Sequence, residues 1–233
     1  FASASNDEIL AYLRELKAST AKEVFRMRLM IVGPGDAGKT TLVHRLLTDE
    51  FSPGLFSMTD GVSMKEWNPS PEISLSLWDF GGQQVYLNTH AMLFADKTLY
   101  LLVWNPRAGT DVRVLEEYLF NIRSRAKSGS LVMLVTTHGS EVDEKESRRW
   151  LGHLSQYNCL SHHNLDSSTG MGIPELRESI KKCVTEDCAE YSRVLVPGWY
   201  VALECELKRL AESKFSIPRD EFNSVCFASW KSS

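Results

Sequence analysis

The chain lacks the features that mark membrane, secreted and nucleic-acid-binding proteins. No apolar run approaches the ~20 residues of a transmembrane helix, and no basic stretch followed by an apolar core suggests a signal peptide. The five cysteines are odd in number and lack C-x-x-C spacing, which argues against a disulfide framework and a zinc site. The net charge of −4 does not favour a nucleic-acid partner. We therefore expect a cytoplasmic protein without a transmembrane segment.

The remaining composition and patterning predict an α/β protein. With 233 residues, 43% of them hydrophobic, the chain is long enough to bury a core without disulfides. Continuous apolar runs at 25–32, 98–104 and 131–135 are typical of strands buried on both faces. Helical patterns at 111–125 and 144–154, and from Pro174 to about Ala189, alternate with these strands. This order predicts a largely parallel sheet flanked by helices.

Several local patterns complete the secondary-structure prediction. Residues 6–17 have the spacing of a short amphipathic helix, and 49–60 are rich in loop-forming residues. Alternating runs at 61–67 and 73–78 predict an antiparallel hairpin whose turn is Asn68-Pro69-Ser70-Pro71. Helical spacing also begins at Trp199, whereas 214–233 have no clear pattern.

The stretch Gly33-Pro34-Gly35-Asp36-Ala37-Gly38-Lys39-Thr40 matches G-x-x-x-x-G-K-[ST] at every fixed position. It lies between a predicted strand and a helical pattern that begins at Thr41, as a phosphate-binding loop requires. Glycines let backbone N–H groups converge on phosphates, and the helix N-terminus adds its positive dipole. We expect these eight residues and Thr41 to bind nucleotide, with Lys39 at the terminal phosphates and the Thr40 hydroxyl on Mg²⁺.

A second motif, Asp79-Phe80-Gly81-Gly82-Gln83, follows the loop by roughly 40 residues and closes a predicted strand. Asp79 is placed to hold Mg²⁺, commonly through water. Gly82 lacks a side chain, so its N–H can approach a γ-phosphate. The Gln83 amide can orient an attacking water.

The two motifs together resemble a Ras-type GTPase domain. Trp78 to His90 is similar, more narrowly, to the Roc domain of Roco proteins, the family that includes the leucine-rich repeat kinases. The segments 117–126, Thr137-His138 and Val196-Pro197-Gly198-Trp199 resemble the third Roc helix, the family's guanine motif and the start of the COR domain, respectively.

The resemblance implies a Ras-like, six-stranded, mostly parallel sheet with helices on both faces that binds GTP or GDP with Mg²⁺. It implies a linker at 1–20, a Roc-like GTPase domain at 21–190 and the beginning of a COR domain at 191–233. Thr59 would ligate Mg²⁺ and sense the γ-phosphate, which makes Lys39, Thr59 and Gln83 the expected catalytic residues. Expected partners are leucine-rich repeats and a COR domain of the same protein, a kinase domain, and a second copy in a homodimer.

The base-recognition motif departs from the family pattern. Ras-type proteins use N-K-x-D, whose Asp accepts two hydrogen bonds from guanine. Here Thr137-His138-Gly139-Ser140 places a serine at that position, without the charge or bidentate geometry of a carboxylate. The adjacent Glu141 either substitutes for it or is a solvated surface charge. Asp166-Ser167-Ser168 stands where the family has its second guanine motif, S-A-K. A backbone N–H makes the contact to the guanine oxygen there, so Ser167 can still supply it.

Two functions from different classes fit these residues. A slow GTPase switch is favoured by the retained Gln83; because 49–59 contain no Lys or Arg, the missing positive charge would come from a partner. The alternative is a nucleotide-binding scaffold or dimerisation module with little hydrolysis, which the altered base motif favours. An ATPase is the third possibility. Arg107 and Arg113 either reach across an interface or are solvated.

Overall fold

The computed structural model describes residues 21–52, 59, 61–82, 92–108, 112–126, 129–139, 159–211 and 216–231, with residues 7, 10 and 14. The chain divides into two compact units, 25–192 and a second formed by 1–24 with 193–233. The helix expected at 144–154 lies outside the described residues. So do most residues of the helix expected at 6–17 and of the loop expected at 49–60.

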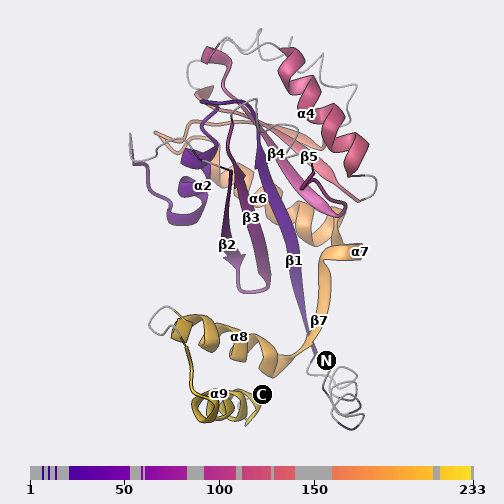
Figure 1. The fold of residues 1–233 in the computed structure, drawn as a ribbon, viewed down its shortest axis with the longest axis vertical. Coiled ribbons are helices and arrows are strands. Elements are labelled where there is room, and N and C mark those ends of the chain that lie inside the picture. Colours follow the sequence, from indigo (N-terminus) through magenta and orange to yellow (C-terminus); the bar gives the residue numbers. More distant parts are fainter. Residues whose placement is uncertain are drawn as a thin grey trace. The chain divides into compact units, whose positions relative to one another are not determined.

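The larger unit is built on a mostly parallel sheet (Figure 1). Its strands are β1 (Ala21–Val32), β2 (Val62–Ser70), β3 (Ile73–Phe80), β4 (Thr98–Trp104), β5 (Leu131–Thr136) and β6 (Ser161–Asn164). Their spatial order is β2-β3-β1-β4-β5-β6, with only the β2–β3 pair antiparallel within this path. The predicted α/β class with a mostly parallel sheet is confirmed. A seventh strand, β7 (Arg193–Pro197), belongs to the smaller unit and pairs with β1, whose first residues are part of that unit too.

Helices cover both faces of this sheet. On one face, apolar side chains of α2 (Lys39–Thr48) and α6 (Ile173–Lys182) pack against those of β1, β3 and β4. On the other face, α4 (Val112–Arg125) contributes its inner residues, which are Leu115, Tyr118, Leu119 and Ile122. Every residue of β4 is buried, as the continuous apolar run from Thr98 to Trp104 predicts. The core therefore lies in two layers and holds β1 and β4 rigidly at its centre.

Two local predictions were wrong in their bounds. The strand β2 continues through Pro69 to Ser70, so the hairpin turn lies at Pro71-Glu72 rather than at 68–71. The sheet tolerates this proline because β2 is an edge strand, and the register with β3 shifts between Trp67 and Ser70. The long helix expected from Pro174 is interrupted by a π-helical turn, Cys183–Asp187, before the short α7 (Ala189–Ser192).

The smaller unit contains β7 and two helices, α8 (Gly198–Ala211) and α9 (Arg219–Lys231). Arg193 at the start of β7 pairs with Glu23 in the first residues of β1, at 3.3 Å. Residues 219–231 are helical although their sequence shows only a weak apolar periodicity. Among the described residues, no helix is long and apolar enough to cross a bilayer.

Candidate functional site

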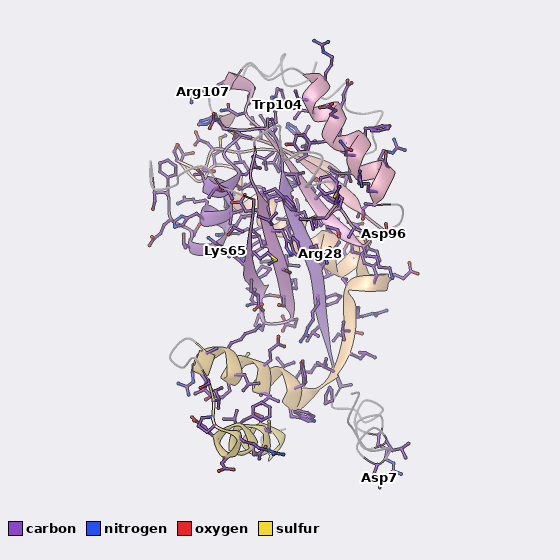
Figure 2. All side chains as sticks on the ribbon, in the orientation of Figure 1. Asp7, Arg28, Lys65, Asp96, Trp104 and Arg107 are labelled. Carbon is purple, nitrogen blue, oxygen red and sulfur yellow. The ribbon has the colours of Figure 1, made fainter. Side chains whose placement is uncertain are left out.

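The sequence-predicted site residues gather at one edge of the sheet. Strands β1, β3, β4, β5 and β6 run parallel, and their registers pair Ile31 with Asp79, Trp104 with Thr136, and Thr136 with Asn164. The segments that follow these strands therefore emerge side by side at their carboxyl ends, where open α/β sheets bind ligands. Figure 2 shows Trp104 and Arg107 at this edge, away from Arg28 in β1.

Glycines set the path of the loop between β1 and α2. Gly33 has a φ of 146° and Gly38 one of 84°, values that favour glycine. A Cβ on Gly33 would also collide with the carbonyl oxygen of Val103 in β4. Gly38 is the N-cap of α2, and because it offers no side-chain cap, the first N–H groups of the helix remain available to an anion.

Lys39 is buried beneath this loop. Its Nζ donates to the carbonyl oxygens of Gly33 (2.9 Å) and Pro34 (2.6 Å). Burial lowers the pKa of Lys39 to about 8, although the nearby carboxylates of Asp79 and Asp36 act in the opposite direction. A buried ammonium with only neutral hydrogen-bond partners is well placed to gain from an added anion.

Three oxygen-bearing side chains from separate segments meet beside Lys39. The Thr40 hydroxyl donates to Asp79 Oδ2 (2.8 Å) and lies 2.9 Å from the Thr59 hydroxyl. Asp79 is 2% exposed, and its Oδ1 has no hydrogen-bond partner among the described residues. Burial raises the pKa of Asp79, opposed by its bond from Thr40 and by the charge of Lys39. Hard oxygen donors around a buried, under-satisfied carboxylate fit Mg²⁺, which takes one or two carboxylates together with phosphate oxygens.

Gly82 closes against the phosphate loop. A Cβ at Gly82 would lie 2.5 Å from Lys39 Nζ and 2.6 Å from the Gly35 nitrogen, so any larger residue would displace one of them. Gly81 donates its N–H to the Gly61 carbonyl at 2.8 Å and thereby anchors the segment after β3. Gln83, the expected catalytic glutamine, lies outside the described residues.

The segments after β5 and β6 form the other end of the site. The Thr137 hydroxyl lies within hydrogen-bond distance of the carbonyl oxygens of Ala37 (3.0 Å) and Trp104 (3.2 Å), which ties this segment to the phosphate loop. His138 has a φ of 56°, and its Nδ1 lies 3.1 Å from Arg107 Nη1. Because a guanidinium only donates, Nδ1 accepts and Nε2 carries the ring proton. Ser140 and Glu141 lie outside the described residues.

A cavity of about 240 Å³ opens between these segments and the start of α2. Its lining residues are Gly38, Thr41, Phe51, Ser52, Thr137, His138, Asp166, Ser167 and Ser168. Six of them were predicted from the sequence to bind nucleotide: Gly38, Thr41, Thr137, His138, Ser167 and Ser168. The cavity brings these residues together beside the phosphate loop.

Some residues of this site were not assigned a role from the sequence. The Tyr118 hydroxyl donates to the Gly33 carbonyl (3.0 Å), and Asn105 Nδ2 donates to the Asp36 carbonyl (3.2 Å). Phe51, Ser52 and Asp166 line the cavity. No motif marks the first two residues, since their contacts depend on strands far apart in the sequence. Asp166 could have been noticed as the one carboxylate in the second guanine segment.

Comparison with known proteins now places the chain in a family. Residues 28–157, more than half of the chain, match the model of the family described as Ras of Complex, Roc, domain of DAPkinase. The chain belongs to the Roc family.

Relatives of this Roc domain are large multidomain proteins. It is 26% identical to the probable serine/threonine-protein kinase pats1 of Dictyostelium discoideum over 92% of this chain and 8% of that protein. It is 27% identical to leucine-rich repeat serine/threonine-protein kinase 1 of Mus musculus over 72% of this chain and 9% of the relative. The chain thus spans less than a tenth of the length of these relatives, as the expected membership of a Roco protein implies.

A solved structure shares the fold. The Roco2 RocCORdC structure of Methanosarcina barkeri, described as bound to GDP, superposes with a TM-score of 0.59 at 23% identity. The match covers 89% of this chain and 62% of that one. The similarity confirms the predicted Ras-like G-domain fold.

Proposed function

We propose that this Roc domain binds GTP and GDP with Mg²⁺, hydrolyses GTP slowly and relays its nucleotide state to adjacent domains of a larger protein. The observation that carries the proposal is the meeting of Lys39, Thr40, Thr59 and Asp79 beside the loop at 33–40. These residues come from three separate segments, and both charged members are buried without a full set of protein partners. Lys39 and Asp79 stabilise each other's charge only in part, and a phosphate and a divalent cation would supply further partners of opposite charge.

Each residue then has a defined task. The N–H groups from Gly35 to Thr41 and the Lys39 ammonium hold the phosphates, while Thr40, Thr59 and Asp79 hold the metal. Bound there, Mg²⁺ neutralises charge on the phosphate oxygens. Gly82 lets its own N–H reach the terminal phosphate. Ser140, Ser167 and Ser168, with Thr137 and His138, surround the base.

Hydrolysis needs a water in line with the terminal phosphate and positive charge on its transition state. Gln83 would orient the water through its side-chain amide. No Lys or Arg lies in residues 49–59, so that loop offers no arginine in cis. The expected turnover is therefore slow until a partner or a second copy supplies the charge.

The relay would begin where the terminal phosphate touches the protein. Thr59 and Gly82 lie at the ends of the segments that would order around it. We propose that residues 191–233 begin a COR domain and that leucine-rich repeats or a kinase lie elsewhere in the full protein, as the names of the similar proteins suggest. We also propose that the protein acts in the cytoplasm, with a homodimer as its assembly.

One observation favours a second function, a nucleotide-binding scaffold with little hydrolysis. The position that would hold the guanine-reading carboxylate is Ser140, so the nucleotide could serve mainly to order the fold. Such a module would bind nucleotide without releasing phosphate.

A titration with GDP, GTP and ATP in the presence of Mg²⁺, followed by phosphate release over hours, separates these functions. Tight guanine-nucleotide binding with release abolished by Gln83→Leu is the expected result for the switch. Binding without release would favour the scaffold, and equal affinity for ATP would refute the guanine assignment. Lys39→Ala should weaken binding of every nucleotide by more than about 100-fold, because it removes a charge-assisted contact to phosphate.

A further inference from the structure

Two cysteines outside the candidate nucleotide site lie side by side in the π-helical turn that follows α6. Cys183 opens this turn, and Cys188 directly follows its last residue. Both are free thiols at most 1% exposed, and their Sγ atoms are 3.7 Å apart. The turn therefore brings together two nucleophilic side chains that the proposed function does not use.

The backbone of the turn meets the geometric requirement of a disulfide. The Cys188 N–H donates to the Cys183 carbonyl at 2.8 Å. Covalent geometry adds about 1.5 Å on the nitrogen side and about 2.4 Å on the carbonyl side, so the two Cα atoms are at most about 6.7 Å apart. Disulfides join residues whose Cα atoms lie about 4.4–6.8 Å apart. Rotation of the two side chains, with little change in the backbone, can therefore close the bond.

Hydrogen bonds around the pair favour Cys188 as the thiolate. The pKa of Cys188 is lowered first by the hydrogen bond from the Cys183 thiol and then by that from the Tyr191 hydroxyl, against the effect of burial. The Tyr191 oxygen lies 2.8 Å from Cys188 Sγ. The pKa of Cys183 is raised by its bond to Cys188 and by burial. Because the thiolate is the nucleophile, Cys188 is the attacking sulfur and Cys183 the one that completes a bond.

Local opening of the turn gives an oxidant access to the pair. Since neither sulfur is exposed, the backbone bonds that hold the turn must first break. They include the bond from Cys188 to Cys183 and those that the Cys188 carbonyl accepts from the N–H groups of Tyr191 (3.1 Å) and Ser192 (2.9 Å). Hydrogen peroxide is small, so a small opening admits it. Single π-helical turns inside helices are frequent at functional positions.

We propose that Cys183 and Cys188 are a redox modification site, which hydrogen peroxide converts into a reversible disulfide that locks the π-helical turn. The inference goes beyond the proposed function and does not depend on nucleotide binding. It fits the proposed cytoplasmic location, because disulfides of cytosolic proteins are usually transient and serve catalysis or redox sensing.

The oxidation proceeds in two steps. First, the Cys188 thiolate attacks one oxygen of hydrogen peroxide; the S–O bond forms, the O–O bond breaks, and the leaving hydroxide takes up the proton that the thiol lost. Second, Cys183 Sγ attacks Cys188 Sγ; the S–S bond forms, the S–O bond breaks, and the hydroxyl group leaves as water with the Cys183 proton. Two thiols are oxidised and one peroxide is reduced to two waters. A dithiol reductant reverses the reaction by thiol–disulfide exchange.

Peptide mapping tests the bond directly, because the tryptic peptide 183–193 contains both cysteines. The folded chain is treated with hydrogen peroxide, its remaining thiols are alkylated, and it is digested without reductant. We expect peptide 183–193 to lose two hydrogen atoms and to carry no alkyl group, and dithiothreitol to restore both thiols. The exposed Cys205 reports the peroxide dose. Full oxidation of Cys205 while 183–193 keeps two alkylated thiols, or carries a sulfinic acid without a bridge, would overturn the inference.

Cys183→Ser and Cys188→Ser form a matched pair that separates attack from bond closure. In Cys183→Ser, the oxidised Cys188 has no sulfur partner, so we expect a sulfenic acid there that dimedone labels. In Cys188→Ser, Cys183 should be labelled at least about tenfold more slowly. The reverse order would overturn the assignment of Cys188 as the attacking thiol.

Hydrogen exchange in the unaltered chain tests the lock without any substitution. The amides of Cys188, Tyr191 and Ser192 are bonded within the turn, and they should exchange about tenfold more slowly in the oxidised chain because opening is suppressed. The buried amides of β4 are the control and should exchange equally in both states. Equal exchange of the turn amides in the two states would refute the lock.

Discussion

The two ends of the candidate site differ in how fully their buried charged side chains are hydrogen-bonded. At the phosphate end, Lys39 donates only to carbonyl oxygens, and Asp79 leaves one oxygen without a hydrogen-bond partner among the described residues. At the cavity end, Asp166 accepts two bonds on a single oxygen from Ser168. Burial shifts the pKa of Lys39 down and that of Asp79 up, so both charged forms are destabilised without a ligand.

This difference indicates what each end is built for. The phosphate end holds two buried charges that the protein satisfies only in part. The free energy of unfolding should therefore rise strongly when phosphate and Mg²⁺ bind there. At the cavity end the Asp166 carboxylate already accepts hydrogen bonds from Ser168, so its burial should cost less free energy in the absence of a ligand. Substitutions at the two ends should therefore produce effects of different kind and size.

After Lys39→Ala, the largest effect is expected for Asp79→Asn. Removing the charge should weaken Mg²⁺-dependent GDP binding by about 10- to 100-fold, because a metal ligand is replaced by a neutral amide. The nucleotide-free chain should also lose some stability, since the buried Lys39 ammonium loses a nearby opposite charge. Titration of GDP with Mg²⁺ and with EDTA measures the effect. Asp36→Asn is the matched control and should keep the Mg²⁺ dependence; equal loss in both variants would contradict the placement of the metal.

Gly82→Ala should weaken GTP binding by about tenfold, because its Cβ would meet Lys39 Nζ and the Gly35 nitrogen at 2.5 and 2.6 Å. The control is Gly35→Ala, whose nearest neighbour, the Gly82 carbonyl oxygen, would be at an ordinary 3.5 Å. Thermal unfolding of the nucleotide-free variants should show a lower midpoint for Gly82→Ala alone. Equal midpoints would show that the segment after β3 does not pack as closely as described.

The pH dependence of binding should report on Lys39. In the nucleotide-free chain its pKa is about 8, and phosphate raises it, so binding takes up a proton above that pH. GDP affinity should fall about fourfold from pH 7.0 to 8.5, a range below the ionisation of guanine itself. Calorimetry in buffers of different ionisation enthalpy measures the uptake; a constant affinity with no proton uptake would mean that Lys39 is not at the phosphates.

The same pKa has a consequence for folding. The folded-state pKa of Lys39 lies below the usual lysine value of 10.5, so the unfolded chain binds more protons between about pH 8 and 10.5. The Lys39 contribution to the free energy of unfolding should therefore rise with pH across that window.

The smallest effect is expected for Tyr118→Phe, which removes the hydrogen bond to the Gly33 carbonyl. Gly33 keeps its bond from Lys39, so the free energy of unfolding should fall by about 1 kcal/mol and GDP affinity by no more than about threefold. The control is Tyr100→Phe, whose hydroxyl bonds to Ala95 away from the loop. Tyr100→Phe should lower the free energy of unfolding by a similar amount without changing GDP affinity. A tenfold loss of GDP affinity in Tyr100→Phe would contradict the assignment of the affinity effect to the bond between Tyr118 and Gly33.

Much of the site could be predicted because its residues lie next to one another in the chain. The fold class, the phosphate loop and Asp79 follow from apolar periodicity and from motifs at strand ends. Thr59 was reached only through family resemblance, since nothing in its own loop marks it. The predicted turn at 68–71 was wrong because an edge strand tolerates Pro69, so the strand continues to Ser70. The predicted uninterrupted helix from Pro174 was wrong because a π-helical turn closes between Cys183 and Cys188.

The amino-acid sequence by itself determined that glycines at 33 and 38 would shape a loop between a buried strand and a helix, because only glycine adopts those backbone angles readily. The tertiary structure alone decided which side chains share that site. Parallel pairing brings the ends of β1, β3, β5 and β6 to one edge, so Thr40 meets Asp79 and Asp166 lines the same cavity as Gly38. Such contacts depend on strand order, which local patterns do not specify.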